Sequence, residues 1–437
     1  MRDLFYLEKE WLLSFPTHWK MSRLKDHTQT NTGITFTKAD LVEGGHAVLS
    51  YGQVHAKDNP RTKINHALIK YIPDSLILDK DGAKVKKGDY IFADTSEDLE
   101  GCGNCIYVNE DINLFAGYHT TLLRNRNLDN GLYFAYLFMS DPWRSQIRRK
   151  VKSVKLFSVS QGILNQSFII IPPLAEQEAI AAYLDKECEK IGHKIELLER
   201  KADSFRCLRR AIINQAVTRG LDPTMPTKPS GNDWLGDIPE HWSFERTERY
   251  FHSNTKINKD FELHKAFKFL MGTIVPKEEN RDAEEYRDVY EKYNIVEKND
   301  IIINGLNLNY DLKSMRVGIV PYKGIITSAY IVLRPYEDVN ALYFNYLFKA
   351  LDCRKIFHGM GKGVRLTLSF NELRTFEIPI PPKTEQEEIV YYLDEKCGKI
   401  DIIIEKIETK IERLKQLKRS LINEVVTGQR AINTSEA

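Results

Sequence analysis

The sequence predicts an α+β protein: two β-rich domains separated by two long helices that pack as an antiparallel coiled coil. Three observations predict this fold. One stretch occurs twice, both copies carry apolar residues at coiled-coil spacing, and short apolar runs separated by turn residues fill the rest of the chain. The chain is therefore expected to be a pseudo-twofold internal repeat.

The repeated stretch reads IIPPLAEQEAIAAYLDKECEKI from Ile170 and PIPPKTEQEEIVYYLDEKCGKI from Pro379. The copies align at a constant offset without a gap, as far as Thr218 in the first and Thr427 in the second. A match of this length indicates a duplication. In both copies a proline pair stands just before the predicted helix and a glycine follows its end, as expected at the two ends of a helix.

Each copy predicts a helix of about 43 residues, roughly 65 Å long at about 1.5 Å per residue. Apolar residues recur in steps of four and three, which places them on one stripe. The predicted seam residues are Ile191, Ile195, Leu198, Phe205, Leu208, Ile400, Ile404, Ile407, Ile411, Leu414 and Leu417. The steps into Leu208 and Leu417 break the heptad as a stammer would. An antiparallel pair is expected because a parallel pair would need an extended return of the chain.

The predicted organisation has two domains joined by the long helices. The ranges are domain 1 at 1–172, helical region 1 at 173–220, a linker at 221–236, domain 2 at 237–380, helical region 2 at 381–428 and a tail at 429–437. In domain 1 we expect strands in 46–52, 75–82, 90–96, 105–111 and 120–125, and a helix over 132–151 that turns at Asp141. Domain 2 repeats this frame weakly, for example LYFNYLF at 342–348 against LYFAYLF at 132–138, while the segments between differ.

Composition is that of an ordinary globular protein, with 42% hydrophobic and 28% charged residues among 437. The net charge is only +2, so any nucleic-acid surface must be local. No signal peptide and no membrane-spanning run is expected. Six cysteines without framework spacing fit a reducing compartment, and we expect a cytoplasmic protein.

This plan resembles the specificity subunit of type I restriction–modification systems. The resemblance is carried by the two Pro-Pro-x-x-Glu-Gln helix starts, by the Val-Thr helix ends and by the tags FPTHW (15–19) and IPEHW (238–242), the first of which departs from the pattern at Phe15 and Thr17. It implies two target-recognition domains that read a bipartite, asymmetric double-stranded DNA site. It also implies two adenine-N6 methyltransferase subunits and two restriction/translocase subunits as partners, in a complex that uses S-adenosylmethionine, ATP and Mg, with no cofactor in this chain.

Catalytic motifs are missing from the sequence. An adenine methyltransferase would need an Asn/Asp-Pro-Pro-aromatic loop, and neither Pro172-Pro173 nor Pro381-Pro382 has the flanking residues. No glycine segment matches a nucleotide-binding loop. Cys102 and Cys105 have metal-ligand spacing without a second pair, so no metal site is expected. We therefore predict a non-catalytic subunit.

DNA contacts are expected from a basic run and from loops that differ between the domains. The run has no acidic residue within it, as phosphate contacts would require, although a solvated helix face would look the same. Arg and Lys suit guanine edges, and Asn and Gln suit adenine edges. The candidates are Gln53, His55, Lys57, Arg61, Lys63, Arg144, Arg148, Arg149, Lys150, Lys152, Lys155, Asn304, Asn307, Asn309, Lys313, Arg316, Lys362 and Arg365.

The outer faces of the helices are expected to bind the methyltransferase subunits, including Glu176, Gln177, Glu385 and Gln386. The two glutamates could instead be charges that complement the helix dipole. Two other functions stay open on the sequence: the recognition subunit of a related system with a fused methyltransferase–nuclease, and a coiled-coil adaptor that binds no DNA.

Overall fold

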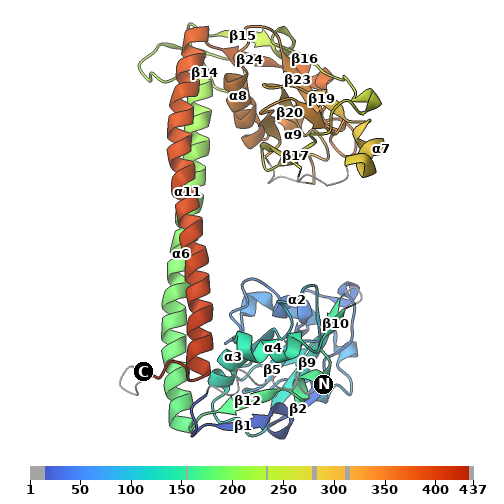
Figure 1. Cartoon of the computed structure of the whole chain (residues 1–437), viewed down its shortest axis with the longest axis vertical. Helices are drawn as coiled ribbons and strands as arrows, with labels where there is room; N and C mark the ends of the chain where they lie inside the picture. The colour runs from blue at the N-terminus through green and yellow to red at the C-terminus, as the bar shows by residue number, and fades with distance from the viewer. Residues whose placement is uncertain (1–14, 154–155, 233–234, 278–282, 311–314, 433–437) are drawn as a thin grey trace. The chain divides into compact units, whose positions relative to one another are not determined.

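The computed structural model describes residues 15–153, 156–232, 235–277, 283–310 and 315–432 (Figure 1). Two predicted DNA-contact residues, Lys155 and Lys313, lie outside these ranges. The chain divides into two compact units. Unit 1 comprises 1–198 with 409–437, and unit 2 comprises 199–408. Each unit therefore joins one β-rich domain to parts of both long helices, α6 (Leu174–Arg219) and α11 (Lys383–Val426).

A four-stranded antiparallel sheet forms the centre of the domain in unit 1, in the order β2 (Thr28–Thr32), β9 (Thr120–Asn125), β5 (Tyr90–Ala93) and β7 (Cys105–Tyr107). Smaller sheets flank it. They are β4 (Lys70–Ile72), β3 (His46–Leu49) and β8 (Leu114–Ala116); β10 (Lys152–Ser153), β11 (Phe157–Ser158) and β6 (Thr95–Ser96); and β1 (Lys20–Arg23) with β12 (Phe168–Ile171). The helices are α2 (Tyr51–Val54), α3 (Gly131–Met139), α4 (Asp141–Arg148) and α5 (Gln161–Asn165).

Predicted and observed strands agree over 90–96 and 120–125, and the helix turns at Asp141 as expected. The strand predicted over 105–111 ends at Tyr107. The strand predicted over 46–52 ends at Leu49, because helix α2 begins at Tyr51. The strand predicted over 75–82 is wrong. This segment holds the 3₁₀ turns η5 (Asp74–Leu76) and η6 (Asp81–Ala83), with Leu78 72% exposed. Asp79 between the turns has φ +59°, a left-handed conformation that a strand cannot contain.

The domain in unit 2 repeats the central sheet in the same order, with β16 (Phe251–Ser253), β23 (Ile331–Pro335), β20 (Ile301–Ile303) and β21 (Val317–Ile319). The paired strands around it are β13 (Thr227–Pro229) with β14 (Asp237–Pro239), β15 (Ser243–Arg246) with β24 (Glu377–Ile380), β17 (Phe267–Leu270) with β18 (Thr273–Pro276), and β19 (Asn294–Val296) with β22 (Gly324–Ile326). The helices are α7 (Arg287–Tyr290), α8 (Ala341–Cys353), α9 (Ile356–Met360) and α10 (Phe370–Arg374). Strand β13 lies within the predicted linker.

The repeated aromatic segment fixes each domain to a long helix in the same way. In unit 1 the Tyr136 hydroxyl donates to Asp185 Oδ1 of α6 at 3.1 Å. In unit 2 the Tyr346 hydroxyl donates to Asp394 Oδ1 of α11 at 2.7 Å. Because Tyr136 and Tyr346 occupy equivalent positions in α3 and α8, the duplication extends from the strands to the attachment of the helices.

The long helices run antiparallel within each unit (Figure 1). In unit 2, Arg206 pairs with Glu408 while Arg209 pairs with Asp401, so the order along α6 is reversed along α11. In unit 1, Ile191 and Ile195 share a hydrophobic cluster with Leu414. Buried or half-buried seam residues are Ile191, Ile195, Leu198, Phe205, Ile400, Ile404, Ile407, Ile411 and Leu414.

The predicted stammer is wrong, because Leu208 and Leu417 are 47% and 54% exposed. The half-buried positions are instead the next residues, Arg209 and Lys418, which continue the regular steps of four and three. Long basic side chains can lay their aliphatic stems on the partner helix and keep their charges in water. In the described part of the chain, no helix is long and apolar enough to span a membrane.

Candidate nucleic-acid interface

A hydrogen-bonded clamp closes the start of each long helix. In unit 1 the carboxylate of Glu176 accepts hydrogen bonds from His18 Nε2 and Trp19 Nε1, both at 2.8 Å. In unit 2 Glu385 accepts from His241 Nε2 at 2.7 Å and from Trp242 Nε1 at 3.1 Å. Each clamp joins the start of a domain to the helix that leaves it.

The glutamines that follow these glutamates are buried. The side-chain amide of Gln177 donates to the Pro172 carbonyl at 2.8 Å, and Gln386 donates to the Pro381 carbonyl at 3.0 Å. The prediction that Gln177 and Gln386 contact other subunits is wrong, because their amides satisfy backbone groups inside the fold. Glu176 and Glu385 have intramolecular partners too, which the sequence pattern did not show.

A crevice of about 850 Å³ lies in unit 1 between the domain and the last part of α11, and we refer to it as the unit 1 crevice. Both basic and acidic side chains line this crevice. The basic side chains are His55, Lys57, Arg61, Arg144, Lys415, Lys418 and Arg419, and the acidic ones are Glu97, Asp98, Glu100 and Asp141. Three of the predicted loop residues, His55, Lys57 and Arg61, thus line the same crevice as residues of α11.

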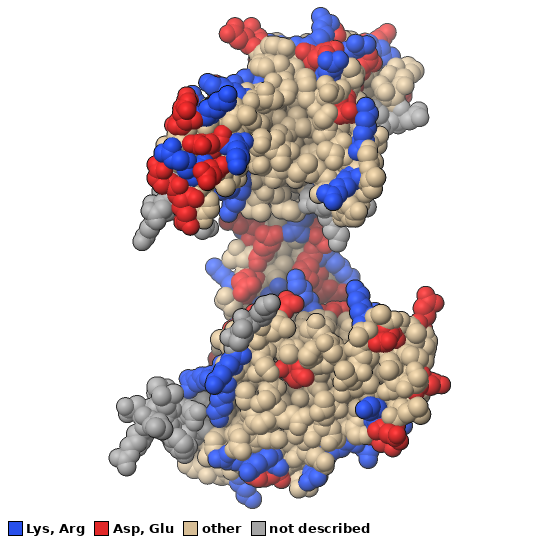
Figure 2. Space-filling model, turned by 90° about the vertical axis from the view of Figure 1, so that its right-hand side faces the viewer, with Lys and Arg blue, Asp and Glu red and all other residues tan. Residues whose placement is uncertain are grey.

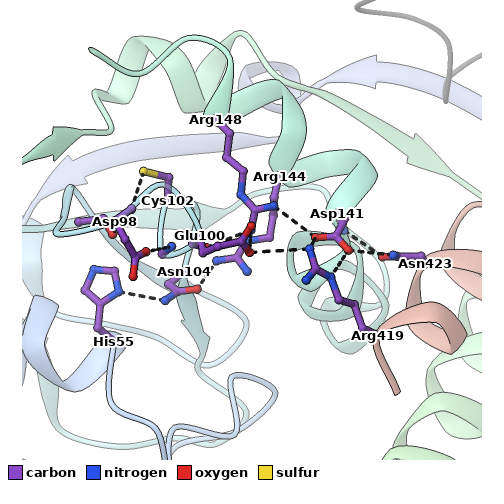
Figure 3. A network of polar contacts seen from close by, with 12 residues as sticks. His55, Asp98, Glu100, Cys102, Asn104, Asp141, Arg144, Arg148, Arg419 and Asn423 are labelled. Atoms are coloured by element: carbon purple, nitrogen blue, oxygen red, sulfur yellow. Dashed lines mark hydrogen bonds and ion pairs between the residues drawn. The ribbon is translucent and has the colours of Figure 1, made fainter. Parts of the chain in front are cut away.

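Asp141 is the centre of the polar network beside this crevice (Figure 3). It accepts hydrogen bonds from Arg419, with Nη2 to Oδ1 at 2.7 Å, and from Asn423 Nδ2 at 3.0 Å. Burial by itself would raise the pKa of Asp141, but the hydrogen bonds from Arg419 and Asn423 outweigh it and lower the pKa to about 2. The network binds α4 to α11 within unit 1.

The part of the basic run that lies on α4 is partly buried. Arg144 is buried and donates to Asn104, whose amide is 2.9 Å from His55 Nδ1 (Figure 3). Burial lowers the pKa of Arg144 to about 9. Arg148 donates to Glu100 Oε2 at 2.9 Å and to Asp141 Oδ1 at 3.3 Å. The expectation that Arg144 and Arg148 lack acidic or polar partners is wrong, because folding brings distant acceptors to them.

In unit 2, Arg316 organises the predicted reading loop from inside. It is 2% exposed, and its guanidinium donates to the carbonyls of Asn304 at 3.1 Å, Leu306 at 2.7 Å and Asn307 at 3.3 Å. A buried side chain that is bonded to backbone carbonyls cannot reach a base edge. Arg316 therefore supports the loop, contrary to its predicted DNA contact.

The comparisons with known proteins agree on one family. A family model described as the type I restriction modification DNA specificity domain matches residues 16–200 and 251–413. The chain belongs to this family. Its two matched regions include the two β-rich domains and parts of both long helices.

Relatives of this DNA-specificity chain match between 65% and 96% of its length. A Methanocaldococcus jannaschii protein assigned as the specificity subunit of the type I restriction enzyme MjaX is 23% identical, over 96% of this chain and 95% of the relative. The Escherichia coli EcoBI specificity subunit is 24% identical, over 65% of this chain and 63% of the relative. A chain from a study of the assembly and conformational transition of the type I R-M system is 16% identical with a TM-score of 0.67, over 95% of this chain and all of the other. That likeness supports the fold.

The remaining candidate residues of the specificity chain are closer to solvent. Gln53 accepts from the Ser50 backbone N–H in a capping box, and Asn309 donates to the Val364 carbonyl at 3.0 Å. Lys362 pairs with Glu372 at 3.1 Å. The exposed side chains among the candidates are Lys57, Lys63, Arg149, Lys150, Lys152, Asn307, Asn309, Lys362 and Arg365. On the face shown in Figure 2, lysine and arginine gather mainly toward the margins of each domain.

The cysteine pair in unit 1 is buried among apolar and basic side chains. Cys102 and Cys105 are both free thiols, and burial raises the pKa of Cys105 to about 12. A thiol with so high a pKa stays protonated at neutral pH, and metal binding requires the thiolate. Within the described ranges, no cluster of three or more potential metal ligands is present.

Proposed function

We propose that this chain reads a bipartite, asymmetric DNA site, with one half-site per domain, and is itself non-catalytic. One observation carries the proposal. The two domains share the strand order β2-β9-β5-β7 and β16-β23-β20-β21, yet the segments between the strands differ in sequence and structure. A shared frame with two sets of loops suits the reading of two different sequences, because base readout depends on side chains at the loop tips.

The DNA contacts in this proposal come from the exposed candidates. Lys57, Lys63 and Lys152 in unit 1 and Arg365 in unit 2 are available for phosphates, and Lys362 would exchange its ion pair with Glu372 for one with a phosphate. Asn307 and Asn309 lie in the loop that Arg316 supports. The exposed amide of Asn307 is the candidate for an adenine edge, and Asn309 holds the loop by its bond to the Val364 carbonyl. The buried residues Arg144 and Arg316 act as supports for these surfaces.

The partners in this proposal are two adenine-N6 methyltransferase subunits and two restriction/translocase subunits, acting with this chain on cytoplasmic DNA. Relatives named as specificity subunits of type I restriction enzymes support this assignment. S-adenosylmethionine, ATP and Mg would be used by the partner subunits. The sequence of this chain has no motif that binds them, which supports a role in recognition and assembly.

The proposal is tested by mapping adenine methylation at base resolution in the source cell, with and without this gene. We expect deletion to abolish methylation at one interrupted, asymmetric motif. Exchange of residues 1–172 for those of a relative should then change one half of the motif and leave the other half intact. An unchanged methylation pattern in an otherwise active system would contradict the proposal and favour a protein-binding adaptor.

A further inference from the structure

A second crevice lies in unit 2 at the position that the duplication makes equivalent to part of the unit 1 crevice. It has a volume of about 290 Å³ and lies between the last part of α6 and the end of α8. We refer to it as the unit 2 crevice. The polar and charged side chains that line it include Arg209, Arg210, Asn214, Lys349 and Arg354.

The two crevices differ at the residues that set their charge. In the aligned sequences Arg210 corresponds to Arg419 and Asn214 to Asn423, so the helix contributes the same groups. At the offset that aligns LYFAYLF with LYFNYLF, the position of Asp141, which binds both groups in unit 1, falls on the buried residue Leu351. The carboxylate of the next residue, Asp352, is buried and accepts a hydrogen bond from the backbone N–H of Arg316 at 2.6 Å. The central carboxylate of the first crevice is thus replaced by an apolar side chain.

The position of Met139 in the unit 1 crevice is taken by Lys349 in unit 2. Lys349 is half-buried. Burial and nearby Arg209 lower its pKa, and the weaker opposing influence of Cys353, Asp401 and Cys397 does not cancel that decrease. No hydrogen bond or ion pair joins its ammonium group to another residue in the described ranges. A cation held beside other cations in a partly apolar crevice is costly unless an anion joins it.

The neighbouring arginines add positive charge, and their own hydrogen-bond partners neutralise it only in part. Arg209 pairs with Asp401 at 2.9 Å, but Asp401 does not line the crevice. Arg210 donates to the Cys207 sulfur at 3.1 Å. Among the described residues that line the unit 2 crevice there is no carboxylate. The crevice therefore has a positive interior with apolar walls.

We propose that the unit 2 crevice binds one phosphate group of the DNA backbone and that the equivalent place in unit 1 does not. This inference rests on the proposed DNA-reading function. A phosphate supplies several acceptor oxygens, so that the ammonium of Lys349 and the guanidinium of Arg210 can bind it together. In unit 1 the guanidinium of Arg419, which corresponds to Arg210, already donates its hydrogen bonds to the carboxylate of Asp141, so it is not available to a phosphate. The half-site read by unit 2 thus gains a backbone contact that fixes the register of the DNA.

The test uses the assembled complex of this chain with its methyltransferase subunits and a duplex that carries both half-sites. Lys349→Met introduces the residue that unit 1 has at this position. We expect about a threefold to tenfold loss of affinity and a decrease of about 0.9 in the slope of log affinity against log salt, as for one lost phosphate contact. Lys349→Arg should restore both values. Lys292→Met, which removes a charge elsewhere in unit 2, is the control and should have a smaller effect.

Two further measurements distinguish a phosphate contact in this crevice from a contact with a partner subunit. A duplex with a single neutral methylphosphonate at the contacted phosphate should weaken wild-type binding and have no added effect on Lys349→Met. The methylated motif should stay the same, since the contact carries no base information. An unchanged salt slope would overturn the proposal, and so would loss of methyltransferase assembly, which would identify a partner carboxylate as the ligand. Failure of the DNA-reading function would appear separately, as absence of sequence-specific binding by the wild-type complex.

Discussion

The indole N–H of Trp242 donates a hydrogen bond to the carboxylate of Glu385 across 143 positions of the chain. Trp19 and Glu176 form the same bond in unit 1 at 2.8 Å. The tags and the helix starts, which look like separate motifs in the sequence, are thus two halves of one structural clamp. Its role is to fix where each long helix leaves its domain.

Removal of this clamp should destabilise unit 2. Glu385→Ala leaves the indole N–H of Trp242 and the ring of His241 without their acceptor, and we expect a loss of about 1–3 kcal/mol in the free energy of unfolding. Glu388→Ala, at an exposed position on the same helix, should change it by less than about 0.5 kcal/mol. Urea unfolding of both variants measures the difference, and equal losses would contradict a structural role for the clamp.

Two alanine substitutions on α11 in unit 1 test which residues form the seam between the long helices. Ile411 is buried, so Ile411→Ala should cost about 2–5 kcal/mol. Leu417 is exposed, so Leu417→Ala should cost less than about 1 kcal/mol, although both residues are in the apolar pattern of the sequence. Thermal unfolding of the two variants gives the comparison. A larger loss of stability for Leu417→Ala than for Ile411→Ala would show that Leu417 belongs to the seam, as the predicted stammer requires.

Substitutions at Arg316 and Arg365 should distinguish support of the loop from contact with DNA. Arg316→Met leaves buried carbonyls at Asn304 and Leu306 without donors, and we expect a loss of about 1–3 kcal/mol in stability. Arg365→Met, at an exposed site, should preserve stability and weaken DNA binding. Chemical unfolding and DNA titration measure the two effects. Normal stability of Arg316→Met would show that the loop does not depend on this guanidinium.

The Asp141 network predicts a dependence of stability on acid pH. The pKa of Asp141 is lowered from its ordinary value of 3.8 to about 2, so its contribution is present above about pH 4 and is lost as the pH falls to about 2. We expect the ionised carboxylate of Asp141 to contribute about 1 kcal/mol to the free energy of unfolding. Solvent around the partly exposed Arg419 screens the pair and keeps this contribution small.

The measurement compares the melting temperature of the wild type and of Asp141→Asn from pH 5 to pH 2. The gap between the two proteins should narrow in acid. Asp129→Asn, at an exposed site, should run parallel to the wild type. A gap that stays constant down to pH 2 would show that the ionised carboxylate contributes no stability.

The sequence by itself determined the duplication, the two long helices with their ends and the strand at 120–125, because periodicity and end signals are local properties of the chain. The tertiary structure decided the rest. Asp141 and Arg419 are far apart in the sequence, and only folding makes them partners and gives Arg148 its acidic acceptors. Arg316 is basic like Arg365, but the folded chain buries one and exposes the other. Burial and long-range pairing depend on which surfaces meet, and no local pattern records that.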